Sequence, residues 1–195
     1  MDGRKSLILL CAGLFLGASP VRAAVVEVSA MYAYSKSEFE DYKGVQRRYT
    51  ASVEFKFTQV SSIQLEYTNS SSEYRTQTDI GTNMVYLTPL VTSYNDKIYS
   101  VNWVQNLVPA KWIVQPYLVL GGGKVARKVT QTRPELGKSQ TDTQNSTTGT
   151  AGAGLRIFLL QNMALKTEFK SYVPDFRFSR WKENQMLSVG LSWLF

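Results

Sequence analysis

The sequence contains no histidine and a single cysteine, Cys11. Without imidazole, every mechanism that needs histidine as a base, an acid or a metal ligand is excluded. One cysteine excludes an internal disulfide, a zinc cluster and an iron–sulfur site. The chain also lacks an apolar run of about 20 residues, so no membrane-spanning helix is predicted. These absences exclude histidine-dependent catalysis and cysteine-ligated metal centres, and no catalytic residue, cofactor or metal ion is predicted in this chain.

The first 23 residues are typical of a secretory signal peptide. Arg4 and Lys5 are followed by a short apolar segment, residues 6–18, and small residues precede the predicted cleavage site after Ala23. Cys11 would leave with this segment, and residues 24–195 would form one exported domain. Its cleavage removes three basic residues and one acidic residue, which lowers the formal charge from +7 to about +5. Because that excess is mild and forms no basic stripe, we expect no nucleic-acid partner.

Apolar residues recur at every second position along most of the remaining chain, which predicts β-strands. The final segment shows the pattern best, because Leu187, Val189, Leu191, Trp193 and Phe195 share one face while Ser188, Gly190 and Ser192 share the other. The segment 113–129 is apolar on both faces, so the pattern does not indicate which of its faces points inward. Eight strands are predicted, at residues 25–35, 47–58, 62–75, 96–107, 112–130, 147–160, 163–173 and 185–195. If residues 84–92 added a hairpin, the number would be ten.

The connections between the predicted strands alternate between short and long. Turns at residues 59–61, 108–111 and 161–162 are short, and the other connections are longer and polar. In the first short hairpin we expect Phe57 opposite Ile63 and Phe55 opposite Leu65, which keeps the apolar face continuous.

Alternation alone fits a soluble barrel with an apolar interior or a membrane barrel with an apolar exterior. Charged residues in the middle of the polar face and aromatic residues near the ends of the apolar face favour the membrane barrel. Eight strands of about 9–11 residues are enough to cross an outer membrane.

These features, with the terminal pattern Leu187-x-Val189-x-Leu191-x-Trp193-x-Phe195, resemble the bacterial outer-membrane β-barrels. In size, the chain is similar to the OmpA transmembrane-domain and OmpX group. The resemblance implies an all-β, up-and-down antiparallel barrel with short periplasmic turns and longer extracellular loops. It also implies that the five terminal residues form the signal read by the barrel-assembly machinery. Enzymes of this family use a histidine, so the resemblance implies no enzymatic activity here, and no peptidoglycan-binding domain is expected after the barrel.

An eight-stranded barrel is just wide enough for side chains to fill it, so inward charges must pair. If the hairpins are symmetrical, Glu54 lies opposite Glu66 and Arg156 lies opposite Glu168. We hypothesise an ion network that plugs the lumen, formed by Glu54, Lys56, Glu66, Arg156, Lys166 and Glu168. The alternative is a set of hydrated charges along a narrow file of water.

Aromatic and basic residues alternate in the last predicted loop, at Phe176, Arg177, Phe178, Arg180, Trp181 and Lys182. Such a rim could contact the phosphates of lipopolysaccharide or a partner surface, or it could simply extend the aromatic girdle. The leading hypothesis is a monomeric outer-membrane protein with a structural or surface-interaction role. The alternatives are a narrow channel for ions or small solutes and a soluble periplasmic binding barrel.

Overall fold

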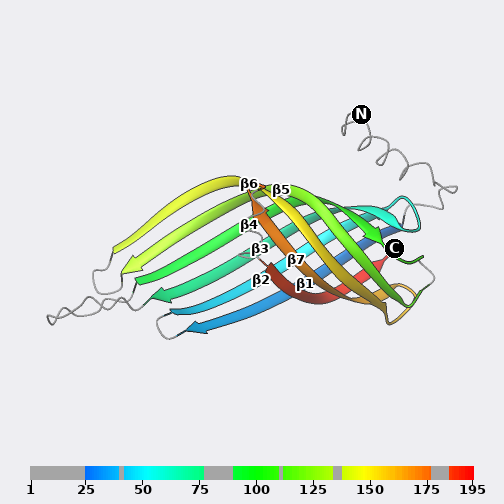
Figure 1. Cartoon of the computed structure of the whole chain (residues 1–195), viewed down its shortest axis with the longest axis horizontal. Helices are drawn as coiled ribbons and strands as arrows, with labels where there is room; N and C mark the ends of the chain where they lie inside the picture. The colour runs from blue at the N-terminus through cyan, green and yellow to red at the C-terminus, as the bar shows by residue number, and fades with distance from the viewer. Residues whose placement is uncertain (1–24, 40–41, 77–89, 110–111, 134–137, 177–184) are drawn as a thin grey trace, which may run out of the picture.

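The structure is a computed structural model, and it describes residues 25–39, 42–76, 90–109, 112–133, 138–176 and 185–195. Each strand pairs antiparallel with the next, and β8 closes on β1, so the sheet forms a closed barrel (Figure 1). This confirms the predicted all-β, up-and-down, eight-stranded fold. The strands are β1 (Val25–Phe39), β2 (Tyr42–Lys56), β3 (Ser61–Thr76), β4 (Leu90–Asn106), β5 (Val114–Arg133), β6 (Lys138–Phe158), β7 (Met163–Pro174) and β8 (Gln185–Leu194).

β3 pairs directly with β4 in the barrel wall, from Ser61 opposite Gln105 to Thr76 opposite Leu90. The wall therefore has eight strands and not ten. Residues 84–89 of the possible extra hairpin lie outside the described residues. The end with the β2–β3, β4–β5 and β6–β7 connections and the chain terminus is called the turn end below, and the opposite end the loop end (Figure 1).

Several strands are longer than the alternation predicted. Predicted loop residues 131–146 largely continue the β5–β6 ladder, which runs from Val114 opposite Ile157 to Arg133 opposite Lys138. Their Thr, Gln and Ser side chains suit a strand that is solvated on both faces, where no apolar alternation is required. β7 and β8 are shorter, at 12 and 10 residues against 20 and 21 for β5 and β6. The wall therefore projects beyond the closed barrel on one side only (Figure 1).

In both predicted hairpins, each residue is paired with a partner two residues away from the predicted one. Phe55 lies opposite Ile63, and Glu54 lies opposite Gln64 and not Glu66. The reason is the turn: the Thr58 hydroxyl accepts hydrogen bonds from the backbone N–H groups of Val60 (3.2 Å) and Ser61 (2.8 Å), so β2 ends at Lys56. Because side chains alternate between faces with a period of two, a register shift of two residues leaves every side chain on its predicted face.

The β6–β7 hairpin shows the same shift, since Arg156 lies opposite Lys166 and not Glu168. Here the N–H groups of Leu159 and Leu160 both donate to the Met163 carbonyl, at 3.0 and 3.1 Å, which tightens the turn.

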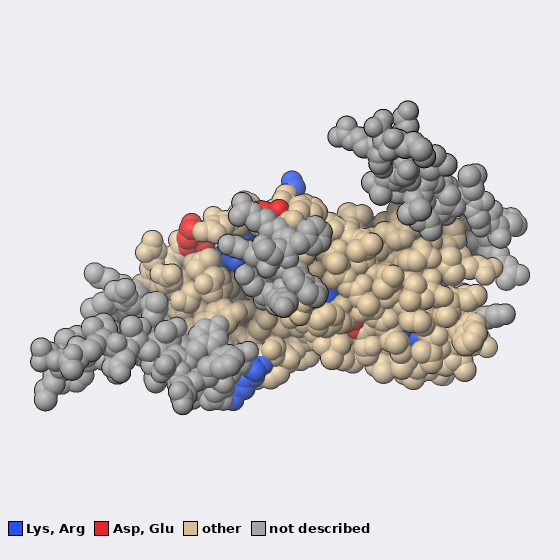
Figure 2. Space-filling view, in the orientation of Figure 1, with Lys and Arg blue, Asp and Glu red and all other residues tan. Residues whose placement is uncertain are grey.

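The polar face of the wall points inward and the apolar face points outward. Ser29, Ser52 and Gln64 are buried, and they join neighbouring strands through hydroxyl and amide hydrogen bonds of 2.7 and 3.0 Å. Phe55, Leu65 and Leu191 are exposed on the outside. Figure 2 shows few charged side chains on the visible surface toward the turn end. This arrangement contradicts a soluble barrel, which would bury those apolar residues.

Candidate functional site

Two charged clusters fill the lumen, one above the other. The turn-side cluster contains Glu27, Glu54, Lys56, Arg156 and Lys166. Arg156 bridges two strands on the opposite wall, with Nε 3.0 Å from Glu27 Oε1 and Nη2 3.0 Å from Glu54 Oε2. Both Arg156 and Lys166 are wholly shielded from solvent. Side chains of this length reaching from β6 and β7 to β1 and β2 span the lumen at this level.

Further contacts complete this cluster. Lys56 Nζ lies 2.8 Å from Glu27 Oε2, and Lys166 Nζ lies 3.6 Å from Glu54 Oε2. The Ser62 hydroxyl donates to Glu54 Oε1 at 2.7 Å, and Arg156 Nη1 donates to Asn106 Oδ1 at 3.2 Å. Pairing of this density offsets the large desolvation cost of buried charge.

The loop-side cluster is built around Lys170. Its ammonium lies 2.5 Å from Glu66 Oε2 and 2.6 Å from Glu168 Oε1, so one cation holds two carboxylates. The Tyr172 hydroxyl donates to Glu66 Oε1 at 2.7 Å.

Tyr117 connects the two clusters. Its hydroxyl donates to Glu168 Oε2 at 3.0 Å, while Arg156 and Lys166 lie over its ring at 5.2 and 5.3 Å from the centroid. The ring occupies the space above Gly154, where an added Cβ would clash with Tyr117 and with the Thr167 carbonyl. The absent side chain at Gly154 thus makes room for the connecting tyrosine.

The structure places all six residues of the hypothesised network inside the barrel, but in two clusters. Glu54, Lys56, Arg156 and Lys166 belong to the turn-side cluster, whereas Glu66 and Glu168 belong to the loop-side cluster. The hypothesis omitted Glu27 and Lys170, although both lie on the polar face of the sequence pattern. Tyr117 was missed because its segment is apolar on both faces.

A cavity of about 530 Å³ lies at the loop end of the lumen and is called the vestibule below. Its wall carries a two-pronged ion pair, in which Arg127 Nε and Nη2 each donate to an Asp96 oxygen at 2.8 Å. Arg127 also lies 5.6 Å from the centre of the Tyr94 ring. The vestibule is lined by Arg48, Asp96, Ile98, Val125, Arg127, Gln144, Asn145, Ser146, Thr148, Tyr172 and Asp175.

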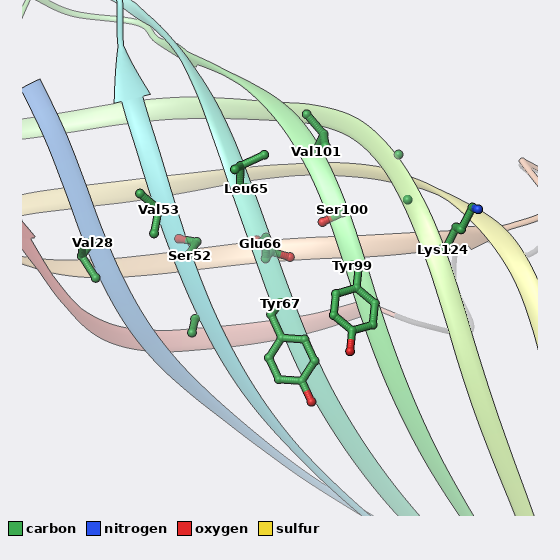
Figure 3. Close-up of a pocket in the computed structure, with 13 residues that line it drawn as sticks. Val28, Ser52, Val53, Leu65, Glu66, Tyr67, Tyr99, Ser100, Val101 and Lys124 are labelled. Atoms are coloured by element: carbon green, nitrogen blue, oxygen red, sulfur yellow. The ribbon is translucent and has the colours of Figure 1, made fainter. Parts of the chain in front are cut away.

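A second concavity, of about 710 Å³, lies on the β1–β5 wall (Figure 3). Leu65, Tyr67, Tyr99 and Val101 line it, and their side chains are exposed on the outside of the barrel. The Tyr67 and Tyr99 rings lie side by side, 5.1 Å apart at their centroids. Because this concavity is apolar and faces away from the lumen, it belongs to the membrane-facing surface and not to a solute site.

The terminal strand carries its apolar residues outward as an unbroken row. Leu187, Val189, Leu191, Trp193 and Phe195 are all exposed, and the Phe195 N–H donates to the Val26 carbonyl at 2.8 Å. Phe176 is the one member of the predicted rim within the described residues, and its ring lies against the outer faces of Gly122 and Gly149. The other five, Arg177, Phe178, Arg180, Trp181 and Lys182, lie outside them.

Within the ranges that the structure describes, no helix is long and apolar enough to cross a membrane. The same ranges bring together no group of three acidic or sulfur side chains suited to hold a metal ion.

An inverted eight-stranded barrel with a charged interior defines the class of transmembrane β-barrels. The chain belongs to the outer membrane protein beta-barrel domain family, whose model matches residues 7–195. It is thus a protein of the bacterial outer membrane. No curated protein matches the chain.

Two solved structures share the fold at low sequence identity. The N-terminal β-barrel domain of Pseudomonas aeruginosa OprF is 14% identical with a TM-score of 0.53, over 90% of this chain and 99% of that one. Yersinia pestis Ail, the attachment invasion locus protein, solved in complex with the heparin analogue sucrose octasulfate, is 15% identical with a TM-score of 0.54. That match covers 89% of this chain and 100% of Ail.

Proposed function

We propose that this protein is a closed, monomeric barrel whose role is structural and interactive and not catalytic. In this proposal it stabilises the envelope and presents its loop end to lipopolysaccharide or to a partner surface. The lumen does not conduct.

The main observation that supports a closed lumen is the presence of two stacked charge clusters inside the barrel. Arg156 reaches Glu27 and Glu54 across the barrel, and Lys170 reaches Glu66. Separating these charges would leave them unpaired in a confined space, at a cost of several kcal/mol each. An ion crossing the lumen would have to break both layers in turn.

The projecting strands support a role at the loop end. A transmembrane strand needs about 9–11 residues, whereas β4, β5 and β6 have 17, 20 and 21. The excess length holds Thr141, Thr143 and Gln144 in ordered strand outside the membrane. An ordered polar surface binds a partner with less loss of entropy than a flexible loop would.

Lipopolysaccharide is the contact that the residue types of the rim favour. By residue type, Phe176, Phe178 and Trp181 would supply apolar surface, and Arg177, Arg180 and Lys182 would supply cations for phosphate groups. During biogenesis, the terminal residues Leu187, Val189, Leu191, Trp193 and Phe195 would direct assembly by the barrel-assembly machinery.

The test is binding of the refolded chain to lipopolysaccharide vesicles at several salt concentrations. A variant with Arg177, Arg180 and Lys182 all changed to Gln should bind at least tenfold more weakly. The matched control changes Lys97, Lys124 and Lys128 to Gln, three exposed cations on β4 and β5. Equal weakening by both variants would contradict a contact carried by the rim.

A further inference from the structure

Arg48 is the one lumen cation without a carboxylate in contact, among the residues that the structure describes. The lumen holds four buried carboxylates, Glu27, Glu54, Glu66 and Glu168, and each contacts at least one of Lys56, Arg156, Lys166 and Lys170. Arg48 is the fifth cation, and only 3% of its surface is exposed. Its Nε is buried and has no hydrogen-bond acceptor.

Two acidic groups whose charges act on Arg48, Glu66 and Asp96, are already paired with other cations. Glu66 accepts from Tyr172 and pairs with Lys170. Asp96 accepts both prongs of Arg127. What Arg48 does contact is the face of the Tyr172 ring, 4.8 Å from its centroid. A buried guanidinium held only by a ring face leaves most of its five donors to another partner.

Arg48 lines the vestibule, and its neighbours in the register form a row across the wall. Arg48 lies opposite Ser70, Ser70 opposite Asp96, Asp96 opposite Arg127, and Arg127 opposite Gln144. The cavity is therefore walled by a guanidinium, an ion pair, hydroxyls and amides at one level, with Ile98 and Val125 as its apolar part. Its volume of about 530 Å³ lies within the usual range of small-ligand sites.

We propose that the vestibule is a binding site for a small oxyanion, such as a carboxylate or sulfate group, free or carried on a sugar-sized polar molecule. The anionic oxygens accept from the Arg48 guanidinium, which neutralises the excess lumen cation. Hydroxyls of the ligand pair with Gln144, Ser146 and Thr148. Asp175 lies at the same cavity and is exposed, so its charge weakens anion binding.

The experiment is calorimetric titration of the refolded full chain in detergent, at constant ionic strength. The probes are sodium glucuronate, sodium sulfate and, as the uncharged counterpart of the first, glucose. We expect saturable binding of glucuronate and none of glucose. Binding of sulfate as well would identify the free oxyanion as sufficient, whereas glucuronate alone would identify an acid group carried on a sugar.

Arg48→Gln should weaken glucuronate binding at least tenfold. The matched control is Arg47→Gln, the adjacent residue on the exposed outer face, which should leave binding unchanged. Asp175→Asn should tighten binding two- to threefold. If Arg48→Gln fails to fold, Arg48→Lys keeps the charge but loses the fork of donors, and it should weaken binding severalfold.

The site is wrong if the wild-type protein binds neither anion, if glucose binds as well as glucuronate, or if Arg47→Gln and Arg48→Gln weaken binding equally. These results do not depend on whether the barrel conducts or binds lipopolysaccharide, so the failure of this proposal is distinct from that of the proposed function.

Discussion

Arg156 and Glu54 meet across the lumen with Nη2 3.0 Å from Oε2, although 102 positions separate them in the sequence. Glu27 shares the same guanidinium, with its Oε1 3.0 Å from Nε. No contact within a single hairpin could hold the two walls in this way. The buried cation ties β6 to β1 and β2 through the centre of the barrel.

Replacing Arg156 with Ala should sharply lower the thermal midpoint in detergent. The change leaves Glu27 and Glu54 without their main cation, and breaking a buried pair costs about 3–5 kcal/mol. The midpoint can be followed by the gel-mobility difference between heated and unheated samples. Arg47→Ala, an exposed control, should leave it unchanged. An unchanged midpoint for Arg156→Ala would contradict a structural network.

Replacing Lys170 with Met should also destabilise the barrel, because Glu66 and Glu168 would lose the ammonium that offsets their two charges. The double variant Lys170→Met with Glu168→Gln removes one of those charges and should recover at least half of the loss. A double variant less stable than Lys170→Met would show that Glu168 has another essential partner. The measurement is the free energy of unfolding by urea in detergent.

Gly154 should tolerate no side chain, in contrast to Gly122. Gly154→Ala should cost about 1–3 kcal/mol, a typical penalty for overpacking, because the Tyr117 ring and the Thr167 carbonyl both occupy the space. An added Cβ at Gly122 would lie 3.2 Å from both the exposed Phe176 ring and the Thr148 carbonyl, a tight contact that a small shift relieves and not a clash, so Gly122→Ala should cost less. Equal losses of stability in both variants would contradict the claim that the Tyr117 ring requires a glycine at position 154.

Phe195→Ala should reduce assembly in cells more than stability in detergent. Phe195 is 74% exposed and makes its described hydrogen bond through the backbone, so losing the ring removes little packing. The fraction of folded protein in the outer membrane should fall severalfold. Leu65→Ala is a lipid-facing control on β3 and should assemble normally. Equal losses would mean that the terminal residue carries no special signal.

The sequence was sufficient to predict which way the alternating strands face, because alternation is a local property, but it did not predict the faces of β5. Glu54, Arg156 and Glu168 were expected on the inner face, and they lie there. The exact register of the β2–β3 hairpin was not predictable, because it depends on how the Thr58 hydroxyl closes the turn. A register shift of two residues moves no side chain to the other face, so the alternation in the sequence is the same for both registers.

The partners of each charge were harder to predict than its face. Arg156 meets Glu27 and Glu54 through the lumen, a contact that depends on the closure and tilt of the whole barrel. Tyr117 lay in a segment with two apolar faces, where no alternation distinguished inside from outside. The strand extension at residues 138–146 was interpreted as loop, because polar residues on both faces give no alternation either.

The most direct test of a closed lumen is the conductance of the refolded wild-type protein in planar lipid bilayers. The same sample should first show a mobility difference between heated and unheated gel lanes, which establishes that the barrel is folded. We expect folded protein and no steady conductance, because two layers of buried ion pairs cross the lumen. Discrete, long-lived conductance steps from the folded sample would contradict the closed barrel and favour a narrow channel.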